Sequence, residues 1–328
     1  MSSWTCEACS FVNPNPGTAC EVCGTSRATP SPPAFAGGGA SAFSGPLELR
    51  APQNTAAREY RLQAIAKKHD IRPDWLPKLD KLKGFAFVLV CDDSSSMTQP
   101  CDPGSHSGSG GPPTGASAGP FAARPSRWQE LRDRVSLIVE LVTALDPMAS
   151  VDVYFLNRRI ELLKVTDESQ LNTAFESAPM GFSPLTKTVQ HVLDTHRYLQ
   201  KNTLLLIATD GEPTDIIGNT ETPPFLQKLM ALPKNVYVQV MACTDDKNSM
   251  LYLNNFKHSL NRVRGAGKRI DITDDFASER KEVQAAQGKS FHFSHGDFLV
   301  KCLLGPVDDH FRSLDKVEGG PLACCSIV

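Results

Sequence analysis

The stretch Ala86-Phe-Val-Leu-Val-Cys-Asp-Asp-Ser-Ser-Ser-Met97 decides the fold that we expect for this chain. An apolar run of strand length ends abruptly at Asp92, and hydroxyl side chains follow at Ser94 and Ser96. In open α/β sheets, ligands bind beyond the carboxyl ends of the strands, so a polar cluster at this point is a candidate site. One carboxylate and two hydroxyls at alternate positions are hard oxygen donors, which suit Mg²⁺ better than zinc.

Two further loops accompany this motif. A second apolar run, 203–209, ends at Asp210-Gly-Glu-Pro-Thr214, and Gly181-Phe-Ser-Pro-Leu-Thr186 lies between the two runs. With Asp92-x-Ser94-x-Ser96, these loops resemble the metal-ion-dependent adhesion site of von Willebrand factor A (vWA) domains. The resemblance covers roughly residues 50–310. It implies an α/β fold with a doubly wound, mostly parallel, Rossmann-like sheet.

The resemblance also implies a set of magnesium ligands, namely Asp92, Ser94, Ser96, Ser183 and Asp210. The chain departs from the family pattern at two positions. Ser95 stands where the family usually has glycine between the two serines, which is expected to stiffen the loop. Ser183 stands where the family usually has threonine, and it keeps the hydroxyl group that a metal needs.

Other interpretations of these loops stay open. Serine and aspartate after a strand often cap the next helix or close a turn. A haloacid-type phosphatase also begins with a strand that ends in aspartate, but its chemistry needs a second acid two residues later, where this chain has Ser94. Three strand ends carry Asp-Asp pairs, at 92–93, 245–246 and 274–275, and we attribute most of these acids to helix capping.

Composition and cysteine usage favour an intracellular protein. The net charge of −2 gives no bulk electrostatic argument for nucleic acid or an anionic membrane. No apolar run approaches a transmembrane length, and the first residues form neither a secretory signal nor a myristoylation site. The ten cysteines cluster near the two ends or are scattered, which is no disulfide framework.

The first residues predict a structural zinc site. Two Cys-x-x-Cys knuckles are separated by ten residues, and four thiolates in this arrangement close a tetrahedral site, formed by Cys6, Cys9, Cys20 and Cys23. So short a segment cannot build a core, so the metal would supply most of its folding free energy. Trp4 before the first cysteine and Asn13 between the knuckles complete a pattern that resembles the Ran-binding-protein type of zinc finger.

Fingers of this type bind single-stranded RNA or ubiquitin. RNA binders carry basic pairs before the third cysteine, where this chain has Pro16-Gly17, and no arginine precedes Arg27. Ubiquitin binders use Thr-Phe after the first knuckle and a large apolar residue in the second. The corresponding residues here are Ser10, Phe11 and Val22. Phe11 either anchors a protein partner or only covers the zinc site, and we favour ubiquitin or another protein over RNA.

The chain is expected to have four parts. The finger occupies 1–27, and a Pro/Gly/Ala/Ser linker that we expect to be disordered occupies 28–53. The vWA domain occupies 54–310, with an N-terminal helical extension and a disordered Gly/Ser/Pro insertion at about 98–125. A tail occupies 311–328. In the tail, Cys325 fits a prenylation pattern except for its terminal valine, and Cys324 beside it is a candidate for palmitoylation. An unmodified tail is the alternative.

Apolar periodicity predicts the elements of the domain. A helix capped by Asn54 covers 55–68, the stretch 72–77 breaks it, and a short element covers 78–82. The expected strands, besides the first, are 151–155, 160–165 at an edge, 203–209, 235–243 and 270–273, and the expected helices are 128–145, 185–199, 248–260 and 276–287, with 298–304 closing the domain.

We therefore expect a non-enzymatic intracellular adaptor in the cytoplasm, where a lipidated tail could hold it at the cytosolic face of a membrane. Its finger would recognise a protein, with ubiquitin as the favoured candidate. Its vWA domain would bind a carboxylate-bearing partner through Mg²⁺. The alternatives are a Mg²⁺-assisted hydrolase that uses the same loops and an RNA adaptor that uses the finger. No histidine lies within a few residues of the acidic loops, which disfavours the hydrolase.

Overall fold

The computed structural model describes residues 51–101, 124–158, 160–196, 200–260 and 266–316, together with two short strands near the N-terminus. The chain divides into two compact units, residues 1–49 and 50–328. In the first unit, β1 (Trp4–Thr5) pairs antiparallel with β2 (Val12–Asn13), and Trp4 lies opposite Asn13. The rest of the predicted finger, the predicted linker up to residue 50, residues 102–123 of the predicted insertion and the end of the tail lie outside the described residues. Residues 51–53, which were assigned to the linker, are helical.

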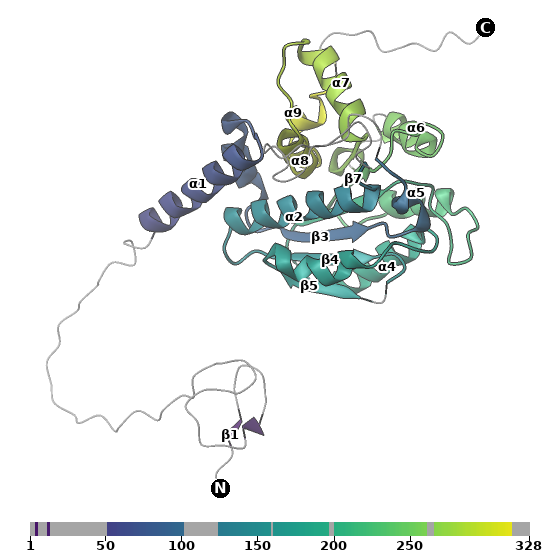
Figure 1. Cartoon of the computed structure of the whole chain (residues 1–328), viewed down its shortest axis with the longest axis horizontal. Helices are drawn as coiled ribbons and strands as arrows, with labels where there is room; N and C mark the ends of the chain where they lie inside the picture. Colours follow the sequence, from purple (N-terminus) through teal and green to yellow (C-terminus); the bar gives the residue numbers. More distant parts are fainter. Residues whose placement is uncertain are drawn as a thin grey trace, which may run out of the picture. The chain divides into compact units, whose positions relative to one another are not determined.

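The second unit is built on a six-stranded sheet with the order β5-β4-β3-β6-β7-β8 (Figure 1). All neighbours are parallel except β5, which pairs antiparallel with β4 at one edge. The strands are β3 (Ala86–Cys91), β4 (Val151–Phe155), β5 (Glu161–Val165), β6 (Thr203–Thr209), β7 (Val236–Ala242) and β8 (Ile270–Thr273). The prediction of an α/β fold with a mostly parallel sheet is confirmed.

Helices cover both faces of this sheet, which makes three layers (Figure 1). One face packs against α2 (Arg127–Leu145), α7 (Phe276–Gln287) and α8 (His295–Leu304), with α1 (Ala51–Lys68) lying on α2. The other face packs against α4 (Leu185–His196), α5 (Thr222–Met230) and α6 (Leu251–Leu260). Short elements complete the unit: η1 (Pro73–Leu82), η2 (Ser95–Thr98), η3 (Glu168–Leu171), α3 (Asn172–Glu176), η4 (Ala266–Arg269) and α9 (Asp309–Arg312).

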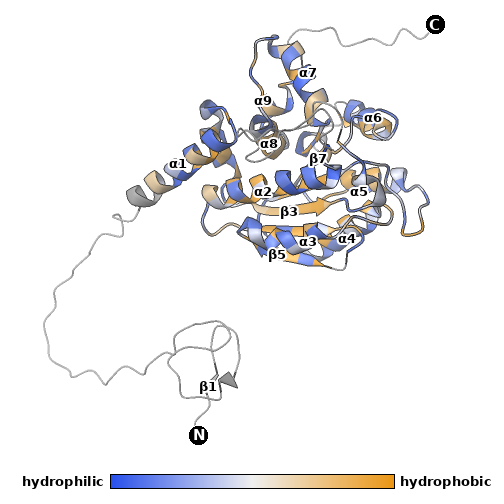
Figure 2. Ribbon diagram, in the orientation of Figure 1, coloured by the Kyte–Doolittle hydropathy of each residue, from blue (hydrophilic) through white to orange (hydrophobic). Residues whose placement is uncertain are grey.

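The central strands are apolar along their whole length because both of their faces are buried. In β3, Phe87 and Leu89 point into the core under α2, whereas Val88 and Val90 point into the core under α4. Figure 2 shows β3 as a hydrophobic strand beside the mixed polar and apolar surface of α2. This arrangement explains why a continuous apolar run, and not an alternating one, marks the strand in the sequence.

The sequence predictions differ from the structure at a few places. The stretch 72–77 follows the end of α1 at Lys68, as predicted, but from Pro73 on it is part of η1, because Trp75 and Leu79 are buried against the core and Pro73 occupies a first helical position. Helix α5 was not predicted. The packed unit also continues beyond residue 310, where the tail was expected to begin, since Phe311 and Leu314 are buried in the core.

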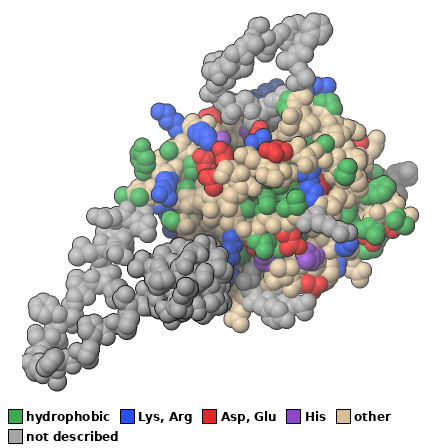
Figure 3. Space-filling model, turned by 60° about the horizontal axis from the view of Figure 1, so that its bottom comes forward, with side chains coloured by type: hydrophobic (Ala, Val, Ile, Leu, Met, Phe, Trp, Pro, Cys, Tyr) green, Lys and Arg blue, Asp and Glu red, His purple; other side chains and the backbone are tan. Residues whose placement is uncertain are grey.

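On the face drawn in Figure 3, acidic and basic side chains of the described residues lie next to each other. None of the described helices is long and apolar enough to cross a membrane.

A buried ion pair joins α7 to α8, so the stability of the fold should depend on keeping both of its charges. Lys301 Nζ lies 2.7 Å from Glu279 Oε1, and both side chains are almost fully buried. Lys301→Met should leave Glu279 without its counter-charge, which costs about 3–5 kcal/mol of stability. Thermal melts would measure this loss. The control is Lys81→Met, which breaks the more exposed pair with Asp308 and should cost no more than about 1 kcal/mol. Equal losses in the two variants would contradict the prediction.

Candidate functional site

The order of the strands places β3 and β6 side by side at the point where the connections diverge to opposite faces of the sheet. The connection after β3 passes through α2 on one face, and the connection after β6 passes through α5 on the other. Such a topological switch point is where open α/β sheets bind ligands. Asp92 follows β3 and Asp210 follows β6, so the sheet brings the two predicted acids to the same place.

The loop after β3 is held by Asp92, which is fully buried. Its Oδ1 accepts a hydrogen bond from the backbone N of Ser94 at 2.9 Å, which closes a tight turn. Its Oδ2 accepts a hydrogen bond from the hydroxyl of Thr209 at 2.6 Å, which ties this loop to the end of β6. Asp92 therefore fixes the position of the serines that follow it.

A chain of hydroxyl groups connects this loop to the second acid. The Oγ atoms of Ser94 and Ser96 lie 3.0 Å apart, and Ser96 Oγ donates to Asp210 Oδ1 at 2.8 Å. The turn of η2 places both serines on the same side, and its buried Met97 anchors the turn in the core. Three of the predicted magnesium ligands are thus linked by direct contacts, and the contact between Ser96 and Asp210 joins residues 114 positions apart.

The loop that contains Ser183 is bonded to both acidic loops. Ser95 N donates to the carbonyl of Gly181 at 3.1 Å, and Gly181 N donates to Ser95 Oγ at 3.0 Å. On the other side, Ser183 N donates to Thr214 Oγ1 and Thr214 N donates to Ser183 O. Ser95, the departure from the family pattern, is therefore a link between loops, a role that the sequence did not reveal.

Gly181 is the one position in this loop where the backbone requires glycine. Its φ is 96°, and a Cβ atom there would lie 2.5 Å from Oδ1 of Asn157. Asn157 in turn donates from Nδ2 to the carbonyl of Phe182 at 2.7 Å. The close approach of Asn157 to the backbone therefore depends on the missing side chain.

Sequence reasoning missed Arg127, the first residue of α2. Its Nη1 lies 2.8 Å from Asp210 Oδ2, and both side chains are largely buried. A signal was present, because a cation in the first turn of a helix opposes the helix dipole and needs another reason to be there. The acid supplies that reason.

Burial and the neighbouring acid Asp210 together raise the pKa of Asp92 to about 6. Burial also raises the pKa of the Cys91 thiol, so this cysteine stays neutral beside the site. The groups bonded to Asp92 and Asp210 are the hydroxyls of Ser96 and Thr209, the backbone of Ser94 and the guanidinium of Arg127. No imidazole or thiolate is among them, so the atoms of this cluster that could bind a metal are the hard oxygens of the carboxylates and hydroxyls.

Asp93 has a structural role. It is fully buried, and it accepts hydrogen bonds from the backbone N of Asn157 at 2.8 Å and from Nε of Arg158 at 3.1 Å. Its side chain thus points away from the serines. Cζ of Arg158 lies 4.6 Å from the ring centroid of Trp128. Loss of Asp93 would therefore leave this packed guanidinium without its carboxylate partner. A substitution of Asp93 is for this reason no neutral control for experiments on Asp92 or on the serines that follow it.

In the other two Asp-Asp pairs, the second acid also has a structural role. Asp246 accepts from the backbone of Asn248 and from the hydroxyl of Ser249, and Asp275 caps α7 by accepting from the backbone of Ala277 and Ser278. These contacts confirm that the second acid of each of these two pairs closes a local turn or caps a helix.

Another group of acids lies at the end of β8. Carboxylate oxygens of Asp274, Glu279 and Glu282 lie within 4.8 Å of one another, beside a cavity of about 670 Å³. Lys257 Nζ lies 3.9 Å from both Asp274 and Glu282 and 3.1 Å from Asp315. The ammonium group of Lys257 therefore already offsets part of the negative charge of these acids.

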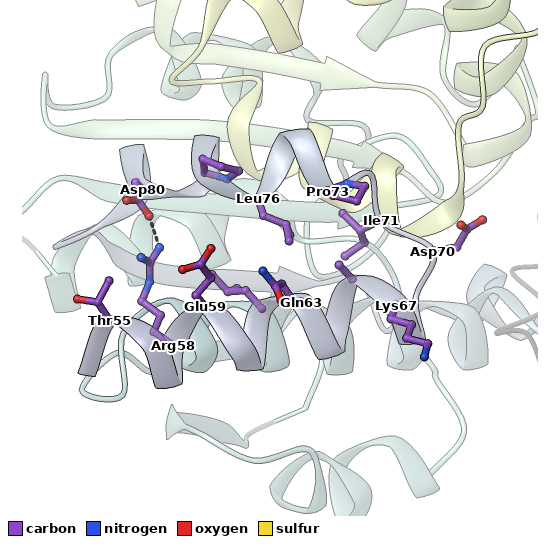
Figure 4. Close-up of a pocket in the computed structure, with 13 residues that line it drawn as sticks. Thr55, Arg58, Glu59, Gln63, Lys67, Asp70, Ile71, Pro73, Leu76 and Asp80 are labelled. Carbon is purple, nitrogen blue, oxygen red and sulfur yellow. Dashed lines mark hydrogen bonds and ion pairs between the residues drawn. The ribbon is translucent and has the colours of Figure 1, made fainter. Parts of the chain in front are cut away.

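A different cavity, of about 650 Å³, lies between α1 and η1. Figure 4 shows Arg58, Glu59, Gln63 and Lys67 of α1 on one side of it, with Leu76 of η1 and Ile71 on the other side. It shares no residue with the acidic loops, so the candidate site is the switch point and not this cavity.

The remaining predicted site residues are Cys6, Cys9, Cys20, Cys23, Ser10, Phe11, Val22, Cys324 and Cys325, and they lie outside the described residues. His106, the nearest histidine in sequence to the first loop, does so as well. Comparison with protein-family models and with curated proteins finds no match for this chain.

The raised pKa of Asp92 predicts a gain in stability for Asp92→Asn without metal. The unfolded carboxyl titrates near 3.8 and the folded one at about 6, so the folded state loses stability as the pH rises between these values. Asparagine mimics the protonated form. In chelator at about pH 7.5, the free energy of unfolding of Asp92→Asn should exceed that of wild type by at most roughly 3 kcal/mol. This difference, followed by thermal melts, should shrink at about pH 5. A pH-independent difference would show that the carboxyl is not perturbed.

Proposed function

We propose that the second unit is a vWA-type domain that binds Mg²⁺ and, through it, a carboxylate group of a protein partner. The observation that carries this proposal is the direct chain of contacts from Ser94 through Ser96 to Asp210 at the switch point of the sheet. Oxygen donors that are held together before a ligand arrives lose little entropy on binding it.

The fold supports the proposal. A mostly parallel sheet with one antiparallel edge strand and helices on both faces is compatible with the doubly wound architecture that the resemblance implies. The hydrogen bonds of Ser95 to Gly181 and of Ser183 to Thr214 bring the three predicted loops together.

The donor chemistry also fits magnesium. The hydroxyls of Ser94, Ser96 and Ser183 and the carboxylates of Asp92 and Asp210 would hold the ion. Bound there, Mg²⁺ would act as an electrophile that accepts an oxygen of the partner. Because only two of the five side chains carry charge, the protein would leave the ion able to attract a carboxylate.

We also propose that the first unit is a zinc finger that recognises a protein, with ubiquitin as the favoured candidate. Pairing of Trp4 with Asn13 supports this assignment, because it brings together the two residues that flank the first knuckle in the family pattern. Cys6, Cys9, Cys20 and Cys23 would bind the zinc ion, and Phe11 with Ser10 and Val22 would contact the partner. The chain would then be an intracellular adaptor with two recognition modules, and lipidation at Cys324 or Cys325 would place it on a membrane.

Metal binding at the switch point is tested with Asp92→Ala and Ser183→Ala. Asp92→Ala removes a charged group from the shell and should weaken Mg²⁺ or Mn²⁺ binding by at least about ten-fold, which is about 1.4 kcal/mol. Ser183→Ala removes a neutral donor and should have a smaller effect, and Ser183→Thr should be tolerated. Calorimetric titration of the metal into the protein measures these affinities.

The matched control is Glu212→Gln. Glu212 is an exposed acid two residues from Asp210, so its replacement removes the same charge from the same loop without touching the proposed ligands. If Asp92→Ala binds the metal as well as Glu212→Gln does, the adhesion-site assignment is wrong.

Phe11→Ala tests the proposal for the finger. Capture of the protein on immobilised ubiquitin should be lost, while the zinc content stays unchanged, because the substitution removes an apolar anchor and no ligand. Immobilised single-stranded RNA is the parallel probe. Retention of the mutant on ubiquitin at the wild-type level would remove Phe11 from the interface, and capture on RNA alone would favour the RNA adaptor.

A further inference from the structure

The guanidinium of Arg127 shares Asp210 with the proposed metal. We propose that Arg127 is a resident cation of this site, which weakens binding of the metal alone and makes it depend on a carboxylate ligand. This inference rests on the proposed function. It assigns to Arg127 a positioning and tuning role that no part of the adhesion-site motif contains.

The backbone holds Arg127 in a fixed place next to the first loop. Arg127 N donates to the carbonyl of Gln99 at 2.9 Å, just after η2, and a β-bridge joins Pro100 to Ser126. Ser126 begins α2 with a capping box that includes Gln129. The start of α2 is thus fastened to the end of the loop that carries the serines, and the contact with Asp210 is built into the fold.

The side chain of Arg127 forms an ion pair with the loop after β6. Its Nη1 lies 2.8 Å from Asp210, whereas its Nε is buried without a hydrogen-bond partner. A buried N–H group without a hydrogen bond costs free energy, which another interaction must offset. Here the ion pair with Asp210 is that interaction. The ion pair of this guanidinium is therefore with Asp210, the acid that follows β6.

The charges determine what this arrangement does. Asp92 and Asp210 contribute two negative charges, and Arg127 contributes one positive charge. A divalent ion would balance the two acids alone, but with Arg127 present the loaded site carries one surplus positive charge, next to the positive end of α2. The two cations repel each other across Asp210, so the metal binds more weakly than it would without the arginine.

A carboxylate removes this surplus. Bound at the metal, it would be attracted by both cations, so metal and carboxylate would each raise the affinity for the other by the same factor. The ligand class is therefore a protein segment with an exposed Asp or Glu side chain. The metal-free protein would keep Asp210 neutralised by Arg127 until such a partner and the ion are both present.

Arg127→Gln in the full chain tests this role. Mn²⁺ is titrated by calorimetry in the presence of chloride or of acetate at the same ionic strength, so acetate is the carboxylate probe. Mn²⁺ alone should bind Arg127→Gln at least about ten-fold more tightly than wild type. Acetate should strengthen Mn²⁺ binding in wild type and much less in the variant. Arg127→Lys keeps the charge and should behave like wild type.

The matched control is Arg132→Gln. Arg132 lies on the same helix but bonds to Asn172 at the surface, so its loss should change neither affinity nor the response to acetate. Should Arg127→Gln fail to fold in chelator, Arg127→Met, which removes the same charge but keeps the apolar stem, takes its place.

The outcomes separate the inference from the proposed function. If wild type binds Mn²⁺ and the neutral variants bind it equally or more weakly, or respond equally to acetate, the role of Arg127 is refuted while the metal site stands. If neither wild type nor the variants bind Mn²⁺, the proposed function fails, and the inference fails with it.

Discussion

Two buried carboxylates at neighbouring strand ends are the constraint on which the rest of this unit depends. Asp92 and Asp210 are brought together because β3 and β6 are adjacent and parallel, and burial together with their mutual repulsion raises the pKa of Asp92. Such a pair is stable only if other groups offset its charge. The hydroxyls of Ser96 and Thr209 and the guanidinium of Arg127 do so in the protein itself.

The loops around this pair form one hydrogen-bonded unit. Ser95 connects the first loop to Gly181, and Ser183 connects the middle loop to Thr214. The hydroxyl of Tyr252, on α6, donates to the carbonyl of Gly211 at 3.1 Å and so ties the third loop to the helix layer. Donors that a metal would need are thus placed by backbone contacts, which is how a rigid scaffold prepares a binding site on loops.

The acids at the strand ends have divided roles. Asp92 faces the serines, whereas Asp93 receives Asn157 and Arg158. Asp246 and Asp275 close turns and cap helices. At the end of β8, the positive charge of Lys257 offsets part of the negative charge of the carboxylates. Burial alone would lower the pKa of Lys257, but the surrounding acids, Glu279 above all, raise it. The same edge of the sheet therefore uses a lysine at one place and an arginine at another to offset buried negative charge.

The sequence by itself determined the elements whose signal is local. Apolar runs located the strands, and the polar residues after them located Asp92, Ser94, Ser96 and Asp210, because side-chain periodicity and strand ends are properties of a few consecutive residues. Only the tertiary structure decided which distant groups meet. Arg127 lies 83 residues from Asp210, and the helical form of η1 depends on the core under Trp75. Such contacts follow from the order of the strands and the packing of the layers, which no local pattern encodes.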